Sequence, residues 1–234
     1  MDKPLIYPLG TSAAIDYAAK YLRLSLVDHP TPDATHLMVD VPLRGLDWLP
    51  ALDMLPQTIT IIGGNLDIPE LQNYRTIDLL KDPEYLARNA AITAHCAVTL
   101  ALPRMQVTLD RCPVLILGWG RIGKCLAQLL RNMGADVTVA VRRDSDLALL
   151  KALGYRAVEY GQLSGILHGF RLIYNTVPAK ILSESTTYNT ECVRIELASV
   201  PGLPGNVADG RGLPGKLAPE SSGRLIAETI LRKI

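Results

Sequence analysis

Apolar runs alternate with amphipathic segments through the second half of the chain. Val114–Leu117 and Val137–Val141 are apolar throughout, and shorter strand-like runs follow at 156–158, 172–174 and 193–198. Apolar residues between these runs recur at helical spacing in two segments, the first built on Ile122, Leu126, Leu129, Leu130 and Met133 and the second on Leu147, Leu150 and Leu153. Fully apolar strands separated by helices are typical of a parallel sheet covered on both faces. We therefore predict a doubly wound α/β domain over residues 108–234, with a C-terminal helix from Pro219.

The first hundred residues carry a weaker pattern. It predicts a helix over Ala13–Leu24 and strands over Leu37–Val41 and Thr58–Ile62. A longer helix is predicted over about 83–101, because Asp82 can cap its start and a proline suits its first turn. We expect residues 1–100 to form a smaller α/β domain of roughly three strands, with that helix linking it to the larger one. The segment 201–215, rich in glycine and proline, is expected to be a loop.

Composition narrows the class of protein. The chain has 234 residues, of which 48% are hydrophobic and 20% charged, and these values exclude a disordered chain. The net charge of +1 offers no field for nucleic acid or an anionic membrane. No apolar run is long enough for a membrane span, and the first residues do not resemble a signal peptide. The four cysteines and four histidines form no metal-binding pattern. We expect a cytoplasmic protein without a metal.

A glycine-rich turn supplies the first candidate chemistry. Gly118, Gly120 and Gly123 follow the strand at 114–117 directly and open the next helix, with Arg121 and Ile122 between the last two glycines. In a GxGxxG turn the first glycine makes the bend, the second leaves room for a pyrophosphate, and the third lets the helix approach the strand. Free amides at the helix start then face the anion. The pattern favours dinucleotide binding; the alternative is a strand-to-helix turn without a ligand.

The tip of the next strand indicates which dinucleotide binds. An acidic residue there would bind the ribose hydroxyls of NAD, but this chain has Arg142 and Arg143. Two guanidinium groups can hold a 2′-phosphate by paired hydrogen bonds. The sequence therefore favours NADP(H) over NAD(H). The alternative is that the two arginines are a solvated surface pair.

Polar residues follow two further strands at the same predicted edge of the sheet. Asn175, Thr176 and Pro178 come after the strand at 172–174, and Ser199 follows the strand at 193–198. Ligands of open parallel sheets lie beyond the carboxyl ends of the strands, so we expect the first three to contact the cofactor. Asn175 or Thr176 could equally cap the next helix. No acid–base pair stands out, and His95 and His168 are expected to be structural. Lys216 is a candidate anion anchor, with an exposed loop lysine as the alternative.

These motifs occur together, and in this order, in a known family. The segments NAAITA at 89–94, VLILGWGRIGK at 114–124, AVRRDSD at 140–146, YNTVPAKIL at 174–182, ELAS at 196–199 and GLPGKLAPESSG at 212–223 resemble the family of dipicolinate synthase A subunits. Departures are His95-Cys96 after Thr93-Ala94, Val200 where the family has a basic residue, and a short segment 199–211, so a sheet strand is expected to be shortened or lost.

The resemblance implies both architecture and function. The family has a small α/β domain ahead of a Rossmann domain similar to D-2-hydroxyacid dehydrogenases, and acts with a flavoprotein-like B subunit in making pyridine-2,6-dicarboxylate (dipicolinate) during sporulation. It implies NADP(H) at the glycine turn and the two arginines, and a dicarboxylate near Thr93, Asn175, Ser199 and Lys216; these four are the catalytic candidates, with no role assigned.

Two classes of function remain open on these grounds. The first is an NADPH-linked oxidoreductase subunit that acts on a cyclic dicarboxylate of the dihydrodipicolinate type. The alternatives are a non-catalytic subunit that binds NADP, since fold alone does not imply activity, and a reductase for another imino or 2-hydroxy acid. A homodimer is the default expectation for the assembly, because two-fold dimers are the commonest closed form.

Overall fold

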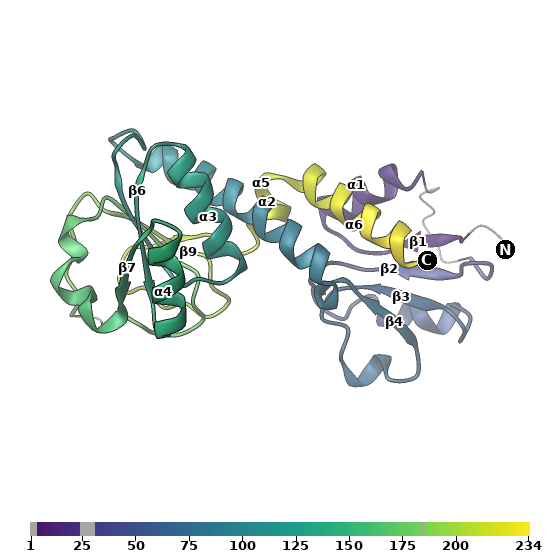
Figure 1. Ribbon diagram of the computed structural model, residues 1–234. Helices are drawn as coiled ribbons and strands as arrows, with labels where there is room; N and C mark the ends of the chain where they lie inside the picture. Colours follow the sequence, from purple (N-terminus) through teal and green to yellow (C-terminus); the bar gives the residue numbers. More distant parts are fainter. Residues whose placement is uncertain (1–3, 24–30, 184) are drawn as a thin grey trace. The chain divides into compact units, whose positions relative to one another are not determined.

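The computed structural model describes residues 4–23, 31–183 and 185–234. The chain divides into two compact units (Figure 1). Unit 1 contains residues 1–89 and 214–234, and unit 2 contains residues 90–213. In the described ranges, no helix combines the length and the apolar character needed to cross a membrane.

Unit 1 is built on a four-stranded parallel sheet. Its strands are β1 (Ile6–Pro8), β2 (His36–Met38), β3 (Thr60–Gly63) and β4 (Arg75–Asp78), and they lie side by side in that order. The hydrophobic pattern predicted the two central strands but neither edge strand. Helix α1 follows β1 and spans Ala13–Tyr21, and the end of the predicted helix at Leu24 lies outside the described residues. Tyr7, Leu37 and Ile61 belong to the apolar core of this unit.

Helix α6 (Pro219–Lys233) packs against α1, and Figure 1 shows the two helices side by side. A glycine makes the contact close: a Cβ atom on Gly223 would lie 2.5 Å from the Ala14 carbonyl oxygen and 2.5 Å from Cβ of Tyr17. The predicted division placed residues 108–234 in one domain, whereas the structure groups 214–234 with unit 1. The sequence marked α6 as a helix but carried no sign of which sheet its apolar face would cover.

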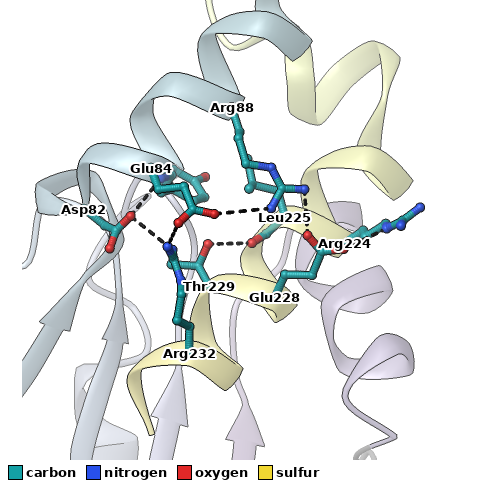
Figure 2. A network of polar contacts seen from close by, with 9 residues as sticks. Asp82, Glu84, Arg88, Arg224, Leu225, Glu228, Thr229 and Arg232 are labelled. Atoms are coloured by element: carbon teal, nitrogen blue, oxygen red, sulfur yellow. Dashed lines mark hydrogen bonds and ion pairs between the residues drawn. The ribbon is translucent and has the colours of Figure 1, made fainter.

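Charged side chains join α6 to the start of helix α2 (Pro83–Ala101), as Figure 2 shows. Asp82 accepts a hydrogen bond from the Tyr85 amide at 2.8 Å, as a helix cap, and also binds Arg232 at 3.2 Å and Lys233 at 2.8 Å. Arg232 reaches Glu84 as well. On the neighbouring turn, the carboxylate of Glu228 is bound by Arg88 at 2.6 Å and by Arg224 at 2.9 Å; Figure 2 shows both contacts.

This network predicts a pH-dependent stability of unit 1. The hydrogen bond from Lys233 is the main cause that lowers the pKa of Asp82, and hydrogen bonds from Arg224 and Arg88 lower the pKa of Glu228. A carboxyl group with a lowered pKa stabilises the folded state above its unfolded pKa of about 4, and the stabilisation is lost as the pH falls from there through the folded value. We expect Asp82→Asn with Glu228→Gln to destabilise unit 1 near pH 7, and the difference from wild type to vanish in strong acid.

Urea titrations at several pH values measure this effect, with Trp48 fluorescence in a Trp119→Phe background as the reporter for unit 1. Asp53→Asn removes an exposed carboxylate elsewhere in the unit and serves as the matched control. A difference between wild type and the double variant that stays constant from pH 7 to strong acid would contradict the assignment.

Unit 2 contains a six-stranded parallel sheet in the order β10-β9-β8-β5-β6-β7. The strands are β5 (Pro113–Leu117), β6 (Asp136–Val141), β7 (Arg156–Glu159), β8 (Leu172–Asn175), β9 (Val193–Glu196) and β10 (Ala208–Asp209). Helices α3 (Arg121–Asn132) and α4 (Asp144–Ala152) connect the first three. The chain then returns to place β8 beside β5. Each of the two units combines a parallel sheet with helices, and the larger sheet is doubly wound. The predicted α/β fold class is therefore confirmed.

The segment 201–215 contains more regular structure than the predicted loop. Its strand β10 has only two residues and pairs with the end of β9, and the short helix α5 (Leu213–Leu217) begins near its end. The edge strand of the sheet is therefore shortened, as the few residues between 199 and 211 led us to expect. The same brevity leaves no room for a crossover helix before β10.

Candidate functional site

The turn between β5 and α3 requires glycine at two positions for packing reasons. Gly118 has φ +100°, a conformation that other residues rarely adopt, and a Cβ atom there would lie 2.6 Å from Oγ1 of Thr176. A Cβ atom on Gly123 would overlap the Gly118 carbonyl oxygen. The first glycine thus lets the turn bend beside the end of β8, and the third lets α3 start directly against the turn.

Gly120 has a different reason for lacking a side chain. It is the N-cap residue of α3, and a Cβ atom added there meets nothing within 4 Å. It borders a cavity of about 610 Å³. The first amides of a helix have no partner inside the helix, and no side chain of the described residues accepts a hydrogen bond from those of α3. Gly120 therefore leaves open space directly in front of the free N–H groups at the start of α3. An anion placed there would be stabilised.

The equivalent turn of unit 1 is already filled. At the start of α1, the carboxylate of Asp40 accepts hydrogen bonds from the amides of Thr11 and Ser12 at 3.2 and 3.1 Å, and from the Thr11 hydroxyl at 3.2 Å. Asp40 is buried. This helix start is satisfied by the chain's own carboxylate, so the glycine turn of unit 2 is the better candidate for binding an external phosphate.

The cavity lies beyond the carboxyl ends of four strands, β5, β6, β7 and β8, at the point where the order of the sheet reverses. It is lined by residues from the glycine turn, from the segment after β6, from the segment after β8 and from the short helical turn after β7 (Gly118, Trp119, Gly120, Val141, Arg142, Arg143, Asp146, Tyr160, Thr176, Val177, Pro178, Ala179, Lys180 and Ile181). Six residues predicted to bind the cofactor are among them. Arg121, Ile122 and Gly123 form the first turn of α3 behind it. This is the site that dinucleotides occupy in open α/β sheets.

The cavity carries both signs of charge, which the motifs did not indicate. Arg143 is exposed, and its Nε atom donates to the carboxylate of Asp146 at 2.8 Å. Asp146 was missed because it lies on the first turn of α4, five residues beyond the end of β6. Lys180, from the segment after β8, adds a third cation. The formal charge of these lining residues is 3 − 1 = +2, since Arg142, Arg143 and Lys180 outnumber Asp146.

Two aromatic rings shape the walls. Tyr160 is half-buried, and burial raises the pKa of its hydroxyl, with Arg142 acting in the opposite direction. The ring of Trp119 packs edge-on against Tyr155, with centroids 5.6 Å apart, and Arg131 covers the Tyr155 ring at 4.1 Å. The indole N–H of Trp119 is buried, and no acceptor for it exists among the described residues. Trp119 is one of only two tryptophans in the chain and therefore reports on this cavity.

Asn175 does not line the cavity, although its place after the strand predicted a contact with the cofactor. Its side chain is fully buried, and its Nδ2 atom donates to both carboxylate oxygens of Glu196, at 2.9 and 3.1 Å. Its Oδ1 atom accepts from the Val177 amide at 3.0 Å. Thr176, in contrast, borders the cavity, and its hydroxyl donates to the Leu117 carbonyl at 2.8 Å. Asn175 therefore holds the backbone of the segment after β8 through its hydrogen bonds to Val177, without contacting the cavity.

Glu196 is the central residue of this arrangement, and sequence reasoning singled it out only as part of a motif. Its carboxylate is buried and also accepts hydrogen bonds from the amides of Ala198 at 3.0 Å, Gly202 at 2.7 Å and Leu203 at 3.2 Å. A buried carboxylate is tolerated where such donors surround it. The Glu196 side chain therefore connects the end of β9 with two segments, the one that follows β9 and the one that follows β8.

The four catalytic candidates are divided between the two units and between buried and exposed positions. Thr93 is buried in α2, and Ser199 is exposed just after β9. Lys216 is exposed and belongs to unit 1, whereas the other three belong to unit 2. His168 is exposed and forms a hydrogen bond with the Thr187 hydroxyl at 3.0 Å. Across the described ranges, no group of three or more potential metal ligands gathers.

The sheet order and the glycine turn together define the fold. A doubly wound parallel sheet with an open glycine turn at its switch point is the Rossmann architecture of dinucleotide-dependent dehydrogenases. An L-alanine dehydrogenase structure superposes on the chain with a TM-score of 0.67 and 13% identity, covering 97% of this chain and 79% of that one. The chain is dehydrogenase-like in fold, as the motifs predicted.

The particular resemblance is to the A subunit of dipicolinate synthase. The structure of that protein from Bacillus halodurans superposes with a TM-score of 0.81 and 18% identity, covering 99% of this chain and 97% of the other. In sequence, the corresponding protein from Bacillus subtilis (strain 168) is 25% identical over 167 residues. That alignment spans 67% of this chain and only 56% of the relative. No family model matches the sequence. The resemblance predicted from the motifs is thus confirmed.

Proposed function

We propose that the chain binds NADP(H) at the glycine turn of unit 2 and serves as an oxidoreductase subunit. The observation that carries this proposal is the geometry of Gly120: an open position at an uncapped helix start, bordering a cavity at the switch point of the sheet. A pyrophosphate fits there, because a Cβ atom would occupy space that no atom of the protein uses. The positively charged lining favours binding of NADP(H), which carries a 2′-phosphate, over binding of NAD(H), which has a 2′-hydroxyl there.

The residues of the chain supply binding and orientation in this proposal. Free amides of α3 stabilise the pyrophosphate, and Arg142, Arg143 and Lys180 surround the 2′-phosphate. Asp146 holds Arg143 in place at the wall of the cavity. The nicotinamide, when bound, supplies the hydride chemistry. Thr176 and Pro178 border the cavity on the side of β8, where Asn175 and Glu196 fix the backbone.

The similarity to the dipicolinate synthase A subunit supports a dihydrodipicolinate-type cyclic dicarboxylate as the substrate, and a B subunit resembling a flavoprotein as the partner. A second candidate, a subunit that binds NADP(H) without catalysing the reaction, is favoured by one observation: Asn175, a proposed substrate contact, is fully engaged with Glu196. Absorbance at 340 nm separates the two. Oxidation or reduction of the cofactor in the presence of dihydrodipicolinate supports the first, with the B subunit present or absent, and binding without an absorbance change supports the second.

Coenzyme preference gives a direct prediction. Titration of a Trp48→Phe chain, in which Trp119 is the remaining fluorophore, should show NADPH binding at least tenfold more tightly than NADH. We expect Arg142→Ala with Arg143→Ala to weaken NADPH binding by roughly 10- to 100-fold, since hydrogen bonds between charged groups contribute about 1.5–3 kcal/mol each. The affinity for NADH should change far less, because the lost contacts are with the 2′-phosphate.

Arg156→Ala is the matched control for these titrations, since Arg156 is exposed on β7 and lies outside the cavity. It should leave both affinities unchanged. Tighter binding of NADH than of NADPH to the wild-type chain would contradict the assignment of NADP(H) as the coenzyme. It would not contradict the location of the dinucleotide site.

A further inference from the structure

A carboxylate shares the coenzyme cavity with the two arginines. Asp146, on the first turn of α4, lines the cavity together with Arg142 and Arg143. Its side chain is only 19% exposed, whereas that of Arg143 is 70% exposed. The start of a helix stabilises a carboxylate, because the helix dipole is positive there. A negative charge is therefore built into the wall of a site that we assign to phosphates.

The ion pair between Arg143 and Asp146 uses only one side of the guanidinium group. Nε of Arg143 donates to Oδ2 of Asp146 at 2.8 Å. Within the described residues, neither the Nη atoms of Arg143 nor the guanidinium of Arg142 has a hydrogen-bond partner. A phosphate bound by these Nη atoms would lie close to Asp146, because Nε and the Nη atoms belong to one rigid planar group. Two anions on one guanidinium are closer than the Debye length of about 8 Å, so salt does not remove their repulsion.

The charge of Asp146 also acts on another residue of the cavity wall, Tyr160. This tyrosine follows β7 and is half-buried. Burial is the main cause that raises the pKa of its hydroxyl; Arg142 lowers this pKa, and Asp146 raises it. The influence of Asp146 is thus not confined to its ion pair with Arg143. Among the described residues that line the cavity, Asp146 is the only acidic one, so it alone opposes the positive charge there.

We propose that Asp146 is a coenzyme-selectivity residue that acts against Arg142 and Arg143. Its carboxylate repels the 2′-phosphate of NADP(H), and it can accept a hydrogen bond from the 2′-hydroxyl that NAD(H) has instead. The preference for NADP(H) is therefore smaller than the two arginines alone would give, and the site retains affinity for NAD(H). The inference rests on the proposed function and deepens it, since it assigns opposite effects on coenzyme choice to side chains of one cavity.

The substitution Asp146→Asn separates this role from that of holding Arg143. The amide oxygen of asparagine can still accept the hydrogen bond from Nε, but the negative charge is gone. In calorimetric titrations of the full chain, we expect NADPH to bind roughly tenfold more tightly to Asp146→Asn than to wild type. NADH should bind no more tightly than before, so the ratio of the two affinities should shift toward NADPH.

Asp144→Asn is the matched control for this experiment. Asp144 lies on the same turn of α4, but it is exposed and does not line the cavity. Its replacement removes the same charge from the same helix start, so any loss of helix stability is shared by the two variants. We expect the ratio of NADPH to NADH affinity to stay at the wild-type value in this control.

A second comparison tests whether the repulsion is direct. In an Arg143→Ala background, Asp146→Asn should still strengthen NADPH binding, because the carboxylate remains in the cavity without its ion pair. No gain in that background would show that Asp146 acts only by holding Arg143, and would overturn the proposal. Unchanged or weaker NADPH binding in Asp146→Asn alone, or an equal gain in Asp144→Asn, would overturn it as well.

The same titrations separate this inference from the proposed function. The affinity ratio can be measured whichever coenzyme binds more tightly, so a wild-type preference for NADH contradicts only the assignment of NADP(H). An unchanged ratio in Asp146→Asn, with both coenzymes still bound, contradicts only the selectivity role. Failure of the wild-type chain to bind either coenzyme would contradict the dinucleotide site and the selectivity role together.

Discussion

Replacing Gly120 by aspartate is expected to abolish NADPH binding while leaving unit 2 folded. A Cβ atom at this position meets nothing within 4 Å, and the backbone there is extended, so the side chain enters without strain. Aspartate is also a favourable N-cap residue, because its carboxylate accepts hydrogen bonds from the first helical amides. The carboxylate would accept hydrogen bonds from the amides that we assign to the pyrophosphate, and its negative charge would repel the pyrophosphate. We expect the affinity for NADPH to fall at least roughly a hundredfold.

Calorimetric titration with NADPH measures the loss, and urea unfolding measures the stability of the variant. Gly165→Asp is the matched control, since Gly165 is also open and exposed but does not line the cavity. Gly120→Ala should have an intermediate effect, because it fills space without adding charge. Undiminished NADPH affinity in Gly120→Asp would mean that the dinucleotide lies elsewhere, and the proposed function would fall with it.

Replacing Glu196 by glutamine is expected to destabilise unit 2 more than any other single polar substitution in the site. The new amide group would face the N–H donors of Asn175, Ala198, Gly202 or Leu203, which the carboxylate now satisfies. Each buried donor left without an acceptor costs about 1–3 kcal/mol, so we expect a loss of roughly 2–4 kcal/mol in the free energy of unfolding. NADPH affinity should fall as well, because the segment after β8 loses its support.

Urea titration followed by Trp119 fluorescence, in a Trp48→Phe background, reports this loss for unit 2. Glu191→Gln makes the same chemical change five residues upstream. Glu191 is exposed and pairs with Arg171 at 2.5 Å, so its replacement should change stability by less than about 1 kcal/mol. Equal effects of the two substitutions would show that the hydrogen bonds to Glu196 contribute no more than a surface ion pair.

The elements of unit 2 could be predicted because their signals are local. Continuous apolar runs predicted the strands at 114–117 and 137–141, and helical periodicity predicted the helix between them. The glycines follow a spacing that is typical of a turn from a strand into a helix. The linking helix at 83–101 was equally clear from its cap. In each case the information lay within a few residues of the element itself, so no knowledge of the fold was needed.

The parts that sequence reasoning missed depend on contacts between distant segments. The edge strands β1 and β4 include a proline or exposed polar side chains, so no continuous apolar run marks them. They form by pairing with β2 and β3. The engagement of Asn175 with Glu196 joins residues 21 positions apart. A single sequence marks such residues as polar but does not indicate what they face.

The division of unit 1 into two pieces bears on how the protein is made. A ribosome completes residues 90–213 before it adds 214–234, so the glycine turn and its whole sheet are available to fold while α1 still lacks the helix that covers it. The nascent chain therefore acquires its proposed nucleotide site first. Unit 1 can be completed only after α6 has been synthesised, and a premature stop codon near residue 213 would leave unit 1 without α6 and open to proteolysis.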